Sequence, residues 1–418
     1  MQRILPTLLF ALFATAGHAD DNSADTIQRG EYLARAAGCA SCHTAPGSRL
    51  FAGGREFVLP IGRLYSTNIT PDEKTGVGGY DDNSWVRMLQ QGVSLDGRRL
   101  YPVMPYTSYE KMSRNDALAI KAYFFSLKPV TATPPENKVE FPYNQRWALG
   151  LWNLFNASNA GFQPDAAKSP ARNRGAYLVE ALGHCGECHT PRNFLQGLKS
   201  GKSYAGAMQQ GWLAYNISGD RSAGIGDWSD EQLKEYLSTG QAPDHGPASG
   251  PMAEIVENSL RYLNTHDIDA IVAYLRDIPP QSDGPPSAPP VAAASSAGTA
   301  FANPSGEHLF AQACAGCHLP SGQGRQSPWS ALGGSHTTGD VEGGNLVQIL
   351  AHGSQIETSQ GLMFMHSFTG GYTDTELAAI ANYLIAQSSG RIGKVTPRQI
   401  RAQRGPDDHK LTDPPLQN

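Results

Sequence analysis

The chain has 418 residues and a formal net charge of −5, with 17% charged residues, 45 glycines and 29 prolines. This mildly acidic balance argues against nucleic acid and against an anionic membrane surface as partners. The length suits two to four domains, and the many glycines and prolines indicate a loop-rich protein.

The first nineteen residues have the features of a secretory signal peptide. Arg3 gives a positive start, residues 4–16 are apolar, and small residues up to Ala19 offer a cleavage site. The apolar stretch is too short to span a membrane. We therefore expect residues 1–19 to be removed and the mature chain to lie in the periplasm. Association with the outer face of the cytoplasmic membrane is left open.

A Cys-x-x-Cys-His motif occurs three times. The motifs use all six cysteines and a histidine each: Cys39, Cys42 and His43; Cys185, Cys188 and His189; Cys314, Cys317 and His318. This is the attachment signature of c-type haem, in which two thiols add to the porphyrin vinyl groups and the histidine binds the iron. Zinc is the alternative, but zinc needs no histidine after every second cysteine, and three pairs do not divide into four-ligand sites. The motifs predict three covalently bound haem c groups.

Each motif belongs to a repeat unit with similar helices at its two ends. The predicted units are residues 20–128, 171–278 and 304–390, here called units one, two and three. A helix opened by a glycine (Gly30, Gly175 and Gly306) precedes each motif. The recurrence predicts a close helix crossing at that point, because an isolated glycine in a helix costs about 1 kcal/mol against alanine. A capped helix with an apolar stripe closes each unit, starting at Ser113, Asn264 and Thr373.

Units one and two also share a middle section. Residues 66–80 and 214–228 contain Asn-Ile-Thr and Asn-Ile-Ser, followed in both cases by a helix. Unit three lacks this section and is correspondingly shorter. Units one and two are therefore predicted to resemble each other more than either resembles unit three.

Three segments lie outside the units. Residues 279–303 are rich in proline and alanine and indicate an exposed tether. Residues 391–418 form a polar C-terminal tail. Residues 129–170 form a linker that contains the apolar stretch 147–155. We expect that stretch to be buried against units one and two; the alternative is docking onto a partner subunit or the membrane surface.

The sixth iron ligand separates an electron carrier from a catalyst, and a methionine thioether there raises the reduction potential. Met104 lies 61 residues after His43, and Met252 lies 63 after His189, both next to prolines. In unit three Met365, 47 residues after His318, is the preferred candidate. Several residues compete: Met88, Met112 and Met208 in units one and two, and Met363, His352 and His366 in unit three.

With these motifs in place, the chain resembles the tri-haem cytochrome c subunits of periplasmic, membrane-associated dehydrogenases. The likeness covers nearly the whole mature chain and includes residues 68–72, 75–78 and 104–106. It implies His/Met ligation of all three haems by His43 and Met104, His189 and Met252, and His318 and Met365. Members of this family usually have proline after the third methionine, where this chain has His366. Some relatives end in an amphipathic membrane-binding helix, for which this polar C-terminus has no counterpart.

The sequence therefore predicts an all-α protein of three tandem class I cytochrome c-like domains. It would take electrons from a dehydrogenase catalytic subunit, whether a quinoprotein, flavoprotein or molybdoprotein, and deliver them to quinone or a terminal oxidase. The organic oxidation would belong to the partner's cofactor, with no catalytic residue in this chain. The alternatives are a free-standing soluble periplasmic carrier and a haem enzyme such as a peroxidase, which would need an open iron site.

Overall fold

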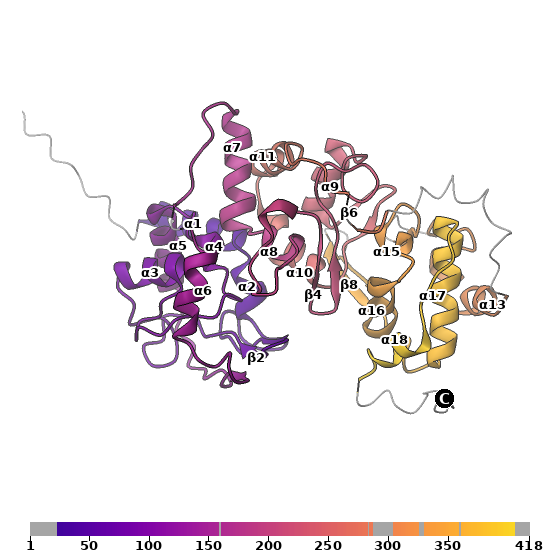
Figure 1. The fold of residues 1–418 in the computed structure, drawn as a ribbon, viewed down its shortest axis with the longest axis horizontal. Helices are drawn as coiled ribbons and strands as arrows, with labels where there is room; N and C mark the ends of the chain where they lie inside the picture. The colour runs from indigo at the N-terminus through magenta and orange to yellow at the C-terminus, as the bar shows by residue number, and fades with distance from the viewer. Residues whose placement is uncertain are drawn as a thin grey trace, which may run out of the picture.

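A computed structural model describes residues 23–158, 160–282, 284–286, 304–325, 330–358 and 361–405. The predicted signal peptide, most of the predicted tether and the end of the chain lie outside these ranges. Figure 1 shows the three predicted units following one another in chain order, all of them mainly helical.

The elements of each part follow the chain. Unit one contains α1 (Ala24–Ala36), α2 (Cys39–His43), β1 (Glu56–Leu59), β2 (Gly62–Tyr65), α3 (Asp82–Gln91), α4 (Tyr106–Tyr109) and α5 (Arg114–Ser126). The linker contains β3 (Lys138–Val139) and α6 (Ala148–Asn156). Unit two contains α7 (Pro170–Tyr177), η1 (Leu178–Leu182), α8 (Gly186–His189), η2 (Ser200–Lys202), β4 (Ala207–Gln209), β5 (Trp212–Ala214), α9 (Asp230–Thr239), β6 (Gln241–Ala242), β7 (Gly246–Pro247), α10 (Pro251–Asn258), η3 (Leu260–Tyr262) and α11 (Thr265–Leu275). Unit three contains α13 (Pro304–Ala313), α14 (Ala315–His318), α15 (His336–Gly339), α16 (Gly344–His352), β8 (Ser354–Thr358), β9 (Gly361–Met365), α17 (Asp374–Ser389) and α18 (Pro397–Arg401).

The first and last helices of each unit cross, α1 on α5, α7 on α11 and α13 on α17. A Cβ atom added at Gly30 would lie 1.8 Å from the carbonyl oxygen of Ala119. The corresponding distances to the facing helix are 1.8 Å at Gly175 and 2.3 Å at Gly306. Only glycine permits backbones to approach so closely, and the predicted crossing is confirmed in all three units.

The closing helices start at the predicted residues. The side chains of Ser113, Asn264 and Thr373 each accept a hydrogen bond from the backbone N–H three residues on, which satisfies an otherwise unpaired donor. The apolar stripe also faces the core, because Ile120, Ile271 and Ile380 are all buried.

The fold is mainly helical, but the all-α prediction is too strict. Among the described residues, short antiparallel strands form a three-stranded sheet, β1–β2–β3, and three hairpins, β4–β5, β6–β7 and β8–β9. Most of these strands lie in the long loops between a motif and its candidate methionine. Pairing as strands gives the polar backbone groups of these loops hydrogen-bond partners.

Unit three has a helix that the sequence did not predict. Helix α16 lies between the third motif and Met365, as α3 and α9 lie between the earlier motifs and their methionines. Unit three thus lacks the Asn-Ile section but still has a helix at the corresponding place. The Asn-Ile motif that marks this region in units one and two is missing, which hid the helix from pattern comparison.

The C-terminal segment up to residue 405 belongs to unit three and is not a free polar tail. Val395 and Ile400 are buried against the third core, and the side chain of Arg404 is fully buried. Helix α18 packs on α17. The sparse apolar residues of this segment each fill a core position, so its overall polarity misled the prediction.

The apolar stretch 147–155 is largely exposed, contrary to the expectation of burial. Helix α6 has no buried residue, and the side chains of Trp147, Leu154 and Phe155 are exposed. Only Leu149 packs into a small core cluster, with Phe57, Leu64 and Tyr101. The helix lies on the surface, with Leu149 packed beneath it and Asn153 accepting a hydrogen bond from Tyr106 at 2.8 Å.

We expect Gly30→Ala to destabilise unit one by about 2–3 kcal/mol, because the new methyl group would overlap the Ala119 carbonyl. Gly344→Ala is the matched control, since nothing lies within 4 Å of its added Cβ and its backbone is not left-handed. Thermal unfolding followed by circular dichroism would measure both. An unchanged melting temperature for Gly30→Ala would refute the close crossing.

Candidate haem-binding sites

Each motif lies on a short helix next to the first helix of its unit. Helices α2 and α8 carry the motifs of units one and two, and α14 carries that of unit three. None of the six cysteines forms a disulfide. Burial raises the pKa of Cys39 and Cys185 to about 12, and that of Cys314 to about 11. These cysteines are therefore thiols, and forming the thioether adds the S–H group across a vinyl double bond.

The three motif histidines share one hydrogen bond. The Nδ1 atoms of His43, His189 and His318 lie 2.6–2.7 Å from the backbone carbonyl oxygens of Thr67, Tyr215 and Ser330, respectively. A carbonyl oxygen only accepts, so Nδ1 carries the proton and Nε2 keeps its lone pair for a metal. Burial lowers the pKa of all three histidines, which favours this neutral form.

The shared Asn-Ile motif holds two of these carbonyls in place, a role that sequence reasoning missed. Asn68 follows Thr67; its amide donates to the Val130 carbonyl, and its Oδ1 accepts from the Thr70 backbone. Asn216 follows Tyr215 and makes equivalent contacts. The asparagine thus ties the loop that carries the histidine's acceptor to the chain after the closing helix. The sequence signal for this role was the position of the asparagine, directly after the residue whose carbonyl accepts the histidine's hydrogen bond.

Met104 and Met252 lie at corresponding places. Met104 stands just before α4, and Met252 is the second residue of α10; both are half-buried against the common core of units one and two. Two competitors have other roles, since Met88 and Met112 are buried in that core. The third competitor, Met208, is exposed on β4.

In unit three the two methionines of β9 contact different cores. Met365 packs against the unit-three core, whereas Met363 packs against the core of units one and two. His366 is exposed, with its ring 4.6 Å from that of Phe368. This arrangement favours Met365 over Met363 as the candidate ligand.

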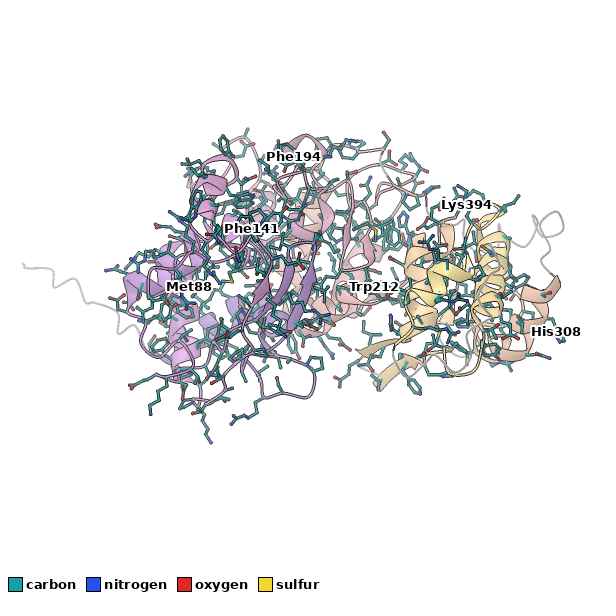
Figure 2. The ribbon with its side chains drawn as sticks, turned by 60° about the horizontal axis from the view of Figure 1, so that its bottom comes forward. Met88, Phe141, Phe194, Trp212, His308 and Lys394 are labelled. Atoms are coloured by element: carbon teal, nitrogen blue, oxygen red, sulfur yellow. The ribbon has the colours of Figure 1, made fainter. Side chains whose placement is uncertain are left out.

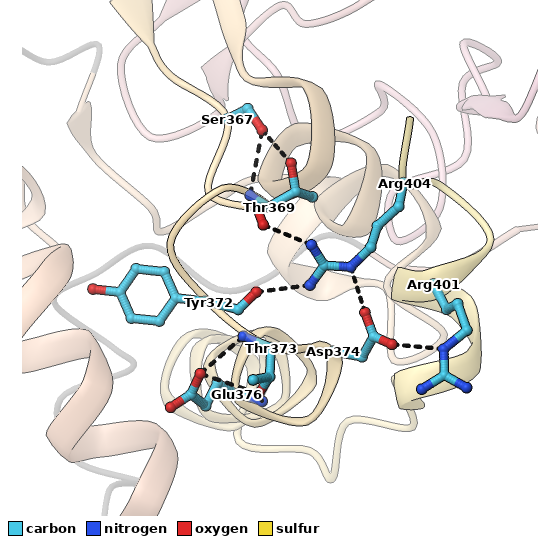
Figure 3. A network of polar contacts seen from close by, with 8 residues as sticks. All are labelled: Ser367, Thr369, Tyr372, Thr373, Asp374, Glu376, Arg401 and Arg404. Carbon is cyan, nitrogen blue, oxygen red and sulfur yellow. Dashed lines mark hydrogen bonds and ion pairs between the residues drawn. The ribbon is translucent and has the colours of Figure 1, made fainter. Parts of the chain in front are cut away.

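The segment after Met365 is held by the C-terminal segment (Figure 3). Arg404 donates to the carbonyls of Thr369 and Tyr372, at 2.6 and 2.7 Å, and pairs with Asp374 at 2.6 Å. Arg401 pairs with the other oxygen of Asp374 at 2.7 Å. Both side chains of the Arg404–Asp374 pair are fully buried. This pair therefore links the loop after Met365 to the start of α17 and to α18.

Units one and two contact each other reciprocally. Tyr32 of α1 donates to Asp267 of α11 at 2.7 Å, and Tyr177 of α7 donates to Asp116 of α5 at 2.5 Å. The two units thus exchange the same contact in both directions, as in an isologous dimer. They also share one core of buried residues, while unit three has its own.

The first two motifs lie at this shared interface. Helix α2 packs on α10, which carries Met252. In the opposite direction the buried carboxylate of Glu187, inside the second motif, accepts from Ser108 at 3.1 Å and Thr107 at 3.3 Å, just after Met104. Each motif therefore lies beside the methionine segment of the other unit.

Unit three joins unit two through the loop that positions His189. The ring of Tyr215 stacks on His336 of α15, with centroids 4.9 Å apart. Asn345 both accepts from and donates to the backbone of Leu213, at 2.7 and 2.9 Å. The residue whose carbonyl orients His189 is thus in direct contact with unit three.

Comparison with known proteins gives consistent matches. Residues 302–384 match the family described as cytochrome C oxidase, cbb3-type, subunit III. The fructose dehydrogenase cytochrome subunit of Gluconobacter japonicus is 37% identical over 90% of this chain and 83% of its own length. The gluconate 2-dehydrogenase cytochrome c subunit of Pantoea cypripedii is 34% identical over 97% and 95%. The alcohol dehydrogenase (quinone) cytochrome c subunit of Gluconacetobacter polyoxogenes is 33% identical over 90% and 83%.

The chain belongs to the family of dehydrogenase cytochrome c subunits. Membership implies covalently bound haem c and a role in electron transfer. The residues of this cytochrome fit that cofactor, because each pair of cysteines is free of disulfides and is followed by a histidine whose Nδ1 donates to a backbone carbonyl, which leaves Nε2 for the iron.

We expect Arg404→Gln to destabilise unit three by about 3 kcal/mol, because the buried carboxylate of Asp374 then keeps only the partly exposed Arg401 as a charged partner. Arg401→Gln is the control: Arg401 pairs with the same carboxylate but is partly exposed, and should cost about 1 kcal/mol or less. Hydrogen exchange of the α17 amides measures the loss of stability in both variants. Equal effects of the two substitutions would contradict this assignment.

Proposed function

We propose that the chain is a tri-haem c-type cytochrome that carries electrons from a periplasmic dehydrogenase subunit to quinone or a terminal oxidase. One observation supports three haem groups: each motif histidine has the same Nδ1-to-carbonyl hydrogen bond beside a cysteine pair. A histidine that only filled space would not need the same ring orientation in three separate units.

In this proposal each unit contributes two thiols, a histidine and a methionine. The axial pairs are His43 with Met104, His189 with Met252, and His318 with Met365. Haem c supplies an iron that alternates between Fe(III) and Fe(II), one electron at a time. The methionine sulfur favours Fe(II) and raises the potential, and a filled sixth position gives a substrate no access to the iron.

The electron donor, the acceptor and the compartment are inferred from other observations. The relatives are named as cytochrome subunits of fructose, gluconate and alcohol dehydrogenases, and the last carries the word quinone in its name. We infer a catalytic dehydrogenase subunit as electron donor and quinone or a terminal oxidase as acceptor. The predicted signal peptide, residues 1–19, supports the periplasm as the compartment.

Native purification tests the proposal. We expect a haem-to-protein ratio of three by the pyridine haemochrome assay, and co-elution with a flavin, quinone-cofactor or molybdenum protein. Replacing Cys314 and Cys317 by alanine should lower the ratio to two. A ratio of two in the unsubstituted chain would reject the tri-haem proposal, and elution as a lone chain would support a free-standing carrier.

The third axial ligand has its own test. Met365→Leu should open the sixth position in unit three, so that the reduced protein binds carbon monoxide at one haem of three. Met363→Leu is the matched control on the same strand and should bind none. Optical spectra with and without carbon monoxide measure both. Binding in the Met363 variant but not in the Met365 variant would reverse the assignment.

A further inference from the structure

Large apolar side chains protrude from α6 and from two segments beside it. We call this group the α6 surface: Phe141, Tyr143, Trp147, Leu151, Leu154, Phe155, Phe194 and Leu195. Phe194 is 90% exposed, Phe155 80% and Phe141 79%. Scattered single apolar residues are normal on a protein surface, but a contiguous group marks an interaction site.

Specific contacts join the three segments. The indole of Trp152 in α6 donates to the backbone carbonyl of Leu195 at 2.7 Å, which holds the 193–198 loop beside the helix. Tyr101 donates to the backbone carbonyl of Tyr143 at 3.0 Å and also contacts Leu149 of α6 in the small core beneath the helix. Phe141 and Phe194 both lie over units one and two, away from unit three (Figure 2).

The charge of this region differs from that of the whole chain. The central segments, residues 147–162 and 193–198, contain no charged residue. The flanking residues 137–146 and 190–203 contain five basic residues and one acidic residue, Glu140; the basic ones are Lys138, Arg146, Arg192, Lys199 and Lys202. The net charge of −5, which argued against an anionic membrane, averages over this basic region.

These features fit a lipid bilayer better than a protein partner. The most exposed rings protrude almost completely, as side chains that insert between lipids do, and tryptophan and phenylalanine favour the membrane interface. Basic residues around an apolar centre add attraction to anionic headgroups. No described helix is long and apolar enough to cross a membrane, so contact through described residues would be interfacial.

We propose that the α6 surface seats this cytochrome on an anionic lipid bilayer. The aromatic and leucine side chains enter the interfacial layer, and the exposed flanking lysines, Lys138, Lys199 and Lys202, meet the headgroups. Leu149, on the inner side of α6, and Cys42 of the first motif pack against the same small core cluster. If the proposed electron transfer holds, the first two haem sites adjoin the membrane-facing surface, the first through this cluster and the second through the 193–198 loop that follows His189.

The test uses the full holo-protein with its haems and flotation with vesicles. Unsubstituted protein should float with vesicles of phosphatidylglycerol and phosphatidylcholine, and more weakly with phosphatidylcholine alone. The double variant Leu154→Ser, Phe155→Ser should lose binding by about 30-fold or more, because two protruding apolar side chains are removed. Leu362→Ser, Phe364→Ser is the matched control on β9 of unit three, with comparable exposure, and should bind as the unsubstituted protein does.

Two outcomes would overturn the proposal: no flotation with either vesicle, or unchanged flotation of the α6 variant. If that variant keeps its lipid binding but no longer co-elutes with a dehydrogenase subunit, the surface is a protein interface. Lipid binding is measured without electron transfer, so its failure leaves the proposed function standing.

Discussion

The hydrogen bond from each motif histidine to a backbone carbonyl is the constraint on which much of this architecture depends. A histidine that binds iron through Nε2 must be held in one ring orientation, and the carbonyl does this without a competing charge. In units one and two an asparagine directly after the carbonyl residue fixes the loop. The middle section is therefore the support of the histidine, and its similarity in the two units follows from that shared role.

The pairing of units one and two follows from a second shared feature. Each closing helix begins with a buried aspartate, Asp116 or Asp267, and each aspartate has an arginine partner in its own unit and a tyrosine partner in the other. Removing one unit would leave the other's buried carboxylate with fewer partners and would expose half of the common core. We infer that the two units form one folding body.

Local patterns of the sequence carried most of the repeat architecture. The glycine at each crossing, the capping residues and the motif helices depend on neighbours a few positions away, so a single sequence reveals them. A single sequence does not reveal the exposure of α6, because an apolar run has the same sequence whether or not another element covers it. The burial of Val395 and Ile400 was missed for the opposite reason: isolated apolar residues in a polar segment give no periodic signal.

Unit three forms the same helical arrangement without a reciprocal partner unit. At the position before the crossing glycine, units one and two have Arg29 and Arg174, but unit three has Ser305. Its closing helix instead presents Asp374, whose partners Arg401 and Arg404 come from beyond the helix. The C-terminal segment thus supplies the cations that a first helix supplies elsewhere, and Arg404 also holds the loop after Met365. Unit three is also attached to unit two at two places: α15 and α16 contact Tyr215 and Leu213, beside the second histidine, and the β8–β9 hairpin packs on α10.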